Sequence, residues 1–128
     1  AGFWRLVLQL AETQLASGEV ETSRRNAAAA LAQAHRAGDR LGEARCHFHL
    51  ARCLGSLRSR VEADQHTASA FESFRLLGDR RSAAECLLEQ AGYGAGKDLH
   101  RLSQALTWAQ QVNWSEGIAQ ASRLSECS

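Results

Sequence analysis

The sequence predicts an all-α fold, a solenoid of antiparallel helix pairs. The tripeptide Gly-Asp-Arg at residues 38–40 returns at residues 78–80, and a recurrence at about 40 residues is typical of helical repeat proteins. The chain has no proline, a residue that interrupts helices, and no run of β-branched residues long enough to favour a strand. We therefore expect one domain, residues 1–128, of about seven stacked helices. The joints are expected near Gly18, Gly38, Arg58, Gly78, Gly94 and Asn113.

The first repeat, residues 3–37, is predicted to form two helices. One runs from Phe3 to Leu15 and ends at Ser17-Gly18. The other runs from Val20 to Ala37 and is rich in alanine, which favours helix formation and permits close packing. The apolar side of the first helix carries Trp4, Val7, Leu8, Ala11 and Leu15.

The second repeat, residues 39–77, is delimited by its turn signals. Asp39 can cap the first turn of a helix. Residues 59–62 (Ser-Arg-Val-Glu) match the capping-box pattern, so a second helix is expected to start near Arg60. Gly78 can adopt the left-handed conformation that ends this helix. Two apolar stripes on the first helix indicate neighbours on two sides. Those stripes are Ala44, Phe48 and Ala51, and Leu50, Leu54 and Leu57; the second helix carries Ala63, Thr67, Ala70, Phe74 and Leu77.

The third repeat, residues 79–112, and a terminal helix, residues 114–125, complete the chain. A helix from Arg80 to about Tyr93 is followed by a glycine cluster. A glycine cluster can cradle phosphate, but this spacing fits neither of the common phosphate-loop patterns and no strand precedes it, so we expect an inter-helix turn. Asp98 and Asn113 are expected to cap the last two helices. Their core sides carry Leu99, Leu102, Leu106 and Ala109, and Ile118, Ala121 and Leu124.

Small residues recur at the repeat spacing. Small side chains at equivalent positions let helices approach closely, so these positions are expected at the contacts between helices. The sets related by this spacing are Ala11, Ala51 and Ala91, and Ser23, Ala63 and Ser103.

These positions resemble the tetratricopeptide (TPR) repeat. That family has a leucine followed by a small residue in the first helix of each repeat and two small residues seven apart in the second. The matching residues are Leu50-Ala51 with Ala63 and Ala70, and Leu10-Ala11 with Ser23 and Ala30, whereas the third copy, Gln90-Ala91, departs from the pattern. The long period and the Gly-Asp-Arg joints look most like the LGN/Pins-like scaffolds. The resemblance implies a right-handed superhelix.

The composition argues against several classes of partner. The formal net charge is +1, so no overall electrostatic attraction draws the chain to nucleic acid or to an anionic membrane. The arginine clusters are short and are interrupted by acidic residues, unlike a continuous nucleic-acid face. The longest apolar runs are far shorter than the roughly 18 residues that a membrane span needs.

The four cysteines do not resemble a disulfide framework. We expect reduced thiols and an intracellular, cytoplasmic protein. The chain starts without methionine, in sequence that is already helical, and we expect it to be a fragment of a larger repeat protein.

One cluster of residues could carry chemistry. Cys46, His49 and Cys53 share a helical face and could begin a zinc site if His66 supplied a fourth ligand. We favour packing instead, because Cys46 has a repeat equivalent in Cys86 and a small apolar side chain suits a helix contact. A thiol nucleophile with a neighbouring histidine is also disfavoured, because adjacent residues on a helix point apart. We therefore expect no bound metal, no cofactor and no enzymatic activity.

The resemblance implies a peptide-binding groove lined by the first helix of each repeat. Arg45 and Arg52 flank Phe48 on one face, so an acidic or carboxylate-bearing peptide would meet two guanidinium groups and an aromatic ring. The alternative is that these arginines only pair with glutamates such as Glu12 and Glu85. The groove positions are Arg5, Leu8 and Glu12 in the first repeat, Arg45, Phe48 and Arg52 in the second, and Glu85 and Leu88 in the third.

Chaperone tails are not expected in this groove. The chaperone-binding members of the family clamp a C-terminal carboxylate with lysine and asparagine, and Leu8 and Glu12 stand at the equivalent places.

We thus expect a non-enzymatic scaffold that binds a protein partner, as a peptide or a helix, in a concave groove. The alternative is a TPR-like regulatory segment of a signalling or transcription regulator that acts by self-association or effector sensing. Nucleic acid and membranes are not expected partners, and self-association stays open.

Overall fold

The computed structural model describes residues 3–93 and 99–126, with side chains described for residues 3–90 and 103–123. The described chain is all-α, as predicted. Its seven helices are α1 (Phe3–Ala16), α2 (Val20–Arg36), α3 (Arg40–Ser56), α4 (Arg60–Leu76), α5 (Arg80–Tyr93), α6 (Leu99–Gln111) and α7 (Ser115–Glu126). The glycines at 94 and 96 and the expected cap Asp98 lie outside the described residues, as do the side chains of Ala91, Leu99, Leu102 and Leu124.

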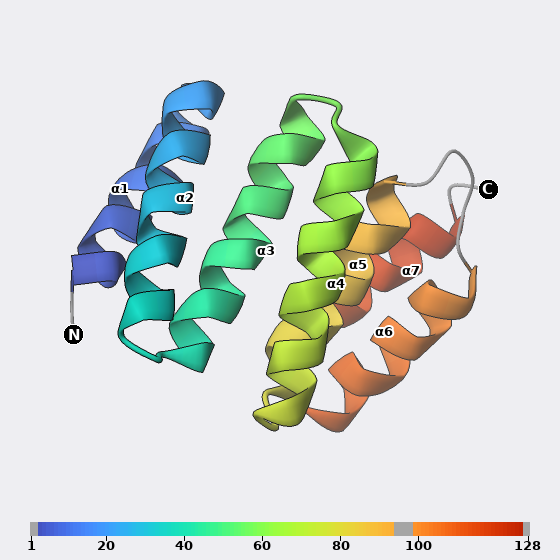
Figure 1. The fold of residues 1–128 in the computed structure, drawn as a ribbon. Coiled ribbons are helices and arrows are strands. Elements are labelled where there is room, and N and C mark those ends of the chain that lie inside the picture. Colours follow the sequence, from blue (N-terminus) through green and yellow to red (C-terminus); the bar gives the residue numbers. More distant parts are fainter. Residues whose placement is uncertain (1–2, 94–98, 127–128) are drawn as a thin grey trace.

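The helices pack in sequence order, each against the next (Figure 1). α1 lies at one end of the row and α6 and α7 at the other. Consecutive odd-numbered helices also touch: α1 contacts α3, α3 contacts α5, and α5 contacts α7. The backbones of the described even-numbered helices lie further apart, although the ring of Phe71 in α4 stacks on that of Trp108 in α6, with 5.6 Å between the ring centres. The odd-numbered helices therefore share the side of the row on which the backbones approach most closely. None of the described helices is both long and apolar enough to cross a membrane.

Five of the six predicted joints are confirmed by the same backbone turn. Gly18, Gly38 and Gly78 have positive φ angles, and so do Arg58 at 63° and Asn113 at 57°. At each turn, two amides bond back to carbonyls of the preceding helix; for example, Asp39 N lies 3.0 Å from Ala34 O. A left-handed residue after the last helical turn closes such a C-terminal motif. The sixth joint, Gly94, lies outside the described residues.

Asp39 joins the first repeat to the second. Its carboxylate accepts a hydrogen bond from the amide of Gly42 at 2.9 Å, the expected N-cap. The indole nitrogen of Trp4 donates to the other oxygen of the same carboxylate at 2.9 Å. The predicted capping box at Ser59 is wrong, since its side chain makes no cap hydrogen bond. Ser59 has ψ of 70°, outside the extended region that aims a capping side chain at the first turn.

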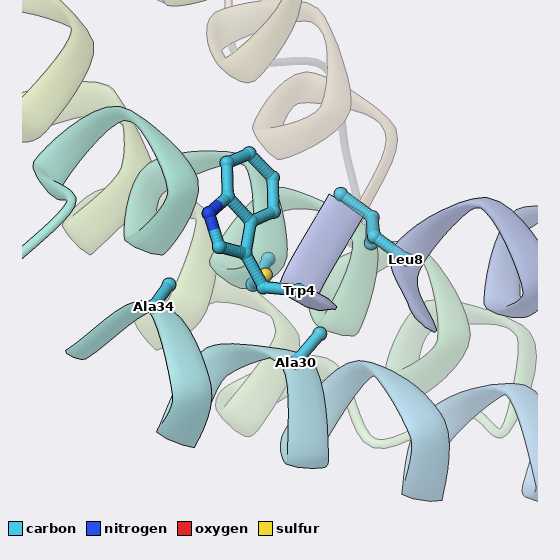
Figure 2. Packing of buried hydrophobic residues seen from close by; sticks show 5 residues of the cluster. Trp4, Leu8, Ala30 and Ala34 are labelled. Atoms are coloured by element: carbon cyan, nitrogen blue, oxygen red, sulfur yellow. The ribbon is translucent and has the colours of Figure 1, made fainter. Parts of the chain in front are cut away.

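The contact between the first two repeats is built from small residues around one large one. Figure 2 shows Trp4 and Leu8 of α1 beside Ala30 and Ala34 of α2, and Cys46 of α3 completes the cluster. The predicted close-contact residues Ala11, Ser23, Ala51 and Ala63 are fully buried.

Three packing predictions are wrong. Leu57 and Leu77 are 41% and 47% exposed rather than core residues. Each is the C-cap residue of its helix, so its side chain projects beyond the last turn at the edge of the row. Ser103, the third-repeat equivalent of Ser23 and Ala63, is also exposed, so this close contact does not extend to α6.

Candidate functional site

The odd-numbered helices line a groove of about 410 Å³, here called the α1–α3–α5 groove. Seven of the eight residues predicted for the peptide site lie on its walls. The exception is Leu88, which is 4% exposed and borders a smaller adjoining hollow of about 200 Å³ with Phe48, Arg52 and Glu85. The seven are Arg5, Leu8, Glu12, Arg45, Phe48, Arg52 and Glu85.

Further groove residues were missed by the sequence analysis. They are Trp4, Gln9, His49, Phe74 and Ser82. Gln9 and His49 occupy one repeat position, directly after Leu8 and Phe48. Extending the predicted face by one residue on each helix would have found this pair.

The middle of the groove is basic and aromatic, and it is contributed by α3. Arg45 is exposed and Phe48 is half-buried. Arg52 is 53% exposed and its Nε lies 3.8 Å from the Glu89 Oε1, a distance beyond a hydrogen bond. Among the described residues Arg45 forms no ion pair. The Arg45 guanidinium is therefore open to an incoming carboxylate, whereas an incoming carboxylate at Arg52 would compete with Glu89.

The alternative, that these arginines pair with neighbouring glutamates, holds for Arg52, which pairs with Glu89; among the described residues neither arginine forms an ion pair with Glu12 or Glu85. Glu85 Oε1 instead lies 3.7 Å from Arg81 Nε. Burial raises the pKa of the Glu85 carboxyl, and Arg81 opposes that rise. Arg5 stacks over the ring of Trp4, 5.1 Å from its centre. Across the groove, Glu12 thus lies on the α1 wall and Glu85 on the α5 wall, and the two arginines of α3 lie between them.

A buried polar cluster lies at the base of the groove between α1, α2 and α3. The Ser23 hydroxyl donates to the carbonyl oxygen of Ala11. Its single proton is therefore used, and the His49 Nε2, 2.8 Å from the Ser23 Oγ, must donate to it. The Cys53 thiol also donates to the Ser23 Oγ, at 3.4 Å. Burial lowers the pKa of His49, which favours the neutral ring, here with its proton on Nε2.

This cluster is arranged unlike a nucleophilic site. A serine nucleophile needs a histidine that accepts its proton, whereas here the histidine donates. The thiols are also held protonated, because burial raises the pKa of Cys46 to about 12 and raises the pKa of Cys53 and Cys86. A thiolate is the reactive form of cysteine, so these side chains act as small packing groups.

The fourth ligand considered for zinc points elsewhere. His66 of α4 lies against His47 of α3, with 2.9 Å between their Nδ1 atoms, and not against His49. Cys46 packs in the cluster around Trp4. Across residues 3–93 and 99–126, no group of three or more metal-ligating side chains is placed to hold an ion.

Comparison with known families adds no assignment. No protein-family model matches the chain, and no curated protein is significantly similar to it.

Proposed function

We propose that this chain is a TPR-like α-solenoid of antiparallel helix pairs with a right-handed twist, and that it is a non-enzymatic scaffold for a peptide or partner helix. The repeated turns, the sequential packing and the small residues at equivalent positions support the solenoid. Three buried free cysteines suit a reducing compartment such as the cytoplasm.

The observation that carries the binding proposal is the convergence of three helices on one groove. Side chains separated by a whole repeat, such as Arg5, Arg45 and Glu85, line the same hollow. A ligand in extended or helical form could contact all three helices at once. Apolar area is available from Phe48 in the middle, and arginine with an aromatic residue is a common anchor of protein interfaces.

The charges of the groove specify the partner more closely. Arg45 and Arg52 lie about two helical turns apart, or roughly 10 Å along α3. They favour two acidic groups at that separation in the partner, with an apolar side chain between them over Phe48. Glu12 and Glu85 disfavour further acidic residues on either side. The preferred partner is thus a segment with two acidic residues and neutral or basic flanks.

A pull-down with this domain, followed by mapping of the bound segment, tests the proposal. We expect a segment with the charge pattern above, and we expect its binding to weaken as salt is raised, because exposed charge pairs are screened. A mapped segment that lacks acidic residues, or one that binds outside the α1–α3–α5 groove, would contradict this proposal.

A further inference from the structure

A second surface, on α1, carries a row of exposed apolar side chains. Phe3, Leu6 and Leu10 are 76%, 64% and 51% exposed. Their spacing places them on one face of the helix, away from Trp4 and Leu8, which face α2 and α3. Single exposed apolar side chains are ordinary, but these three lie in one row, and the later repeats show what becomes of such positions. This row is called the α1 outer face below.

Two of these three positions, those of Leu6 and Leu10, are buried in both later repeats. The equivalents of Leu6 are Cys46 in α3 and Cys86 in α5, and both are 0% exposed. The equivalents of Leu10 are Leu50 and Gln90, which are 5% and 7% exposed. At both internal joints, therefore, this part of the odd-numbered helix is covered by another helix. On α1 it is not.

The helix that covers these positions at the first internal joint is α2, and it presents small side chains. Cys46 packs in one cluster with Ala30 and Ala34 of α2. Leu50 packs in another with Ala27. The docking side of α2 is thus a row of alanines. At the next joint, both Ala70 and the larger Phe74 of α4 lie in the cluster that contains Cys86, where the covered residue is a small cysteine.

We propose that the α1 outer face is a docking surface for an α-helix with small apolar side chains at the spacing of Ala27, Ala30 and Ala34, namely the second helix of another helix pair of this repeat type. The internal joints show how such a helix covers these positions. Leu6 is larger than the cysteines that replace it at those joints, so the opposing side chains must be small. The surface is separate from the α1–α3–α5 groove, which Arg5 and Glu12 face.

A second copy of the chain docking through its own α1 fits less well. α1 has 14 residues and is roughly 21 Å long, so one of its faces offers an area of only about 200 Å². A stable dimer buries about 800 Å² per partner. A docked helix pair covers more surface than a single helix. Its second helix would cover the α1 outer face, and its first helix would touch α1 as well, in the way that α1 touches α3.

An in-register extension tests this proposal on the whole chain. A copy of residues 1–40 is fused directly before Ala1, which keeps the repeat spacing and places a copy of α2, with its Ala27, Ala30 and Ala34, next to α1. Leu6→Cys is then labelled with a thiol reagent in the extended and the unextended proteins, and the label is located by mass spectrometry. We expect labelling at residue 6 to slow by about tenfold or more in the extended protein, as protection by a packed helix requires.

Glu12→Cys is the matched control. Its repeat equivalent, Arg52, is 53% exposed although a repeat precedes it, so the labelling rate at residue 12 should not change. If residue 6 is labelled equally fast in both proteins while circular dichroism shows the added helices formed, the α1 outer face does not accept such a helix. If the unextended chain dimerises and Leu6→Glu abolishes the dimer, the occupant is a second copy and the proposal is wrong.

Discussion

Replacing Gly42 by alanine should destabilise the protein, although glycine to alanine within a helix is normally favourable. Gly42 lies in the first turn of α3, beneath the indole of Trp4. An added Cβ would lie 2.8 Å from Trp4 Cε2, 2.9 Å from Trp4 Cζ2 and 3.1 Å from Ala34 Cβ. Carbon atoms in contact are normally about 3.5–4.0 Å apart. The indole would therefore have to move by roughly 0.7 Å or more.

That movement is opposed from two sides. The indole nitrogen is bonded to Asp39, and the ring is 2% exposed among alanines and Leu8. Overpacking of this kind costs about 1–3 kcal/mol, and the gain in helix propensity is up to about 1 kcal/mol. Subtracting the full gain leaves a net expected loss in the free energy of unfolding of up to about 2 kcal/mol, or up to several degrees in Tm.

A double-mutant cycle with Trp4→Leu isolates the contact. In the Trp4→Leu background the space above Gly42 is open, so Gly42→Ala should stabilise the protein by up to about 1 kcal/mol. The sign of the effect should thus reverse between the two backgrounds, as measured by urea denaturation. If Gly42→Ala is stabilising in the parent chain, or has the same effect in both backgrounds, the account of this joint is wrong.

Two further predictions concern stability. Burial lowers the pKa of His47, His49 and His66, so below about pH 6.5 the unfolded chain takes up protons that the folded chain does not. The free energy of unfolding should therefore fall between about pH 7.5 and about pH 5.5, by up to about 1.4 kcal/mol per pH unit for each histidine, and a flat urea-denaturation profile would contradict this. Ala51→Leu should cost about 1–3 kcal/mol by overpacking a fully buried position; an unchanged Tm would show that position 51 is not a close helix contact.

The joints were predictable because they depend on local backbone chemistry and on the period. Gly18, Gly38 and Gly78 can each adopt positive φ without strain. Arg58 and Asn113 adopt the same positive φ, although neither is a glycine. Their place was predicted from capping residues at the start of the following helix, Ser59 for one joint and Asn113 itself for the other.

Side-chain partners were less predictable because they depend on how helices cross. Arg52 of α3 pairs with Glu89 of α5. Two other glutamates were equally plausible partners from the sequence: Glu85, one helical turn before Glu89 on α5, and Glu12 on α1. Sequence spacing cannot choose among carboxylates that share a face. The same limit applies to Ser23 and His49, whose contact at 2.8 Å joins α2 to α3 and has no short-range sequence signal.

The central proposal is that Arg45 and Arg52 bind an acidic partner segment. Its most direct test is titration of the mapped segment against the parent chain, Arg45→Glu, Arg52→Glu and Arg25→Glu, with melting curves run alongside. Arg25 is exposed on α2 outside the groove, so it is the control for charge reversal alone. Arg45 has no ion pair among the described residues, so its reversal breaks none.

We expect Arg45→Glu and Arg52→Glu each to weaken binding by about tenfold or more, a loss of at least about 1.4 kcal/mol, while Arg25→Glu binds like the parent chain. Unchanged affinity for both groove variants would contradict the account. In that case Arg52→Glu should lower only the Tm, and the groove arginines would serve the fold and not the partner.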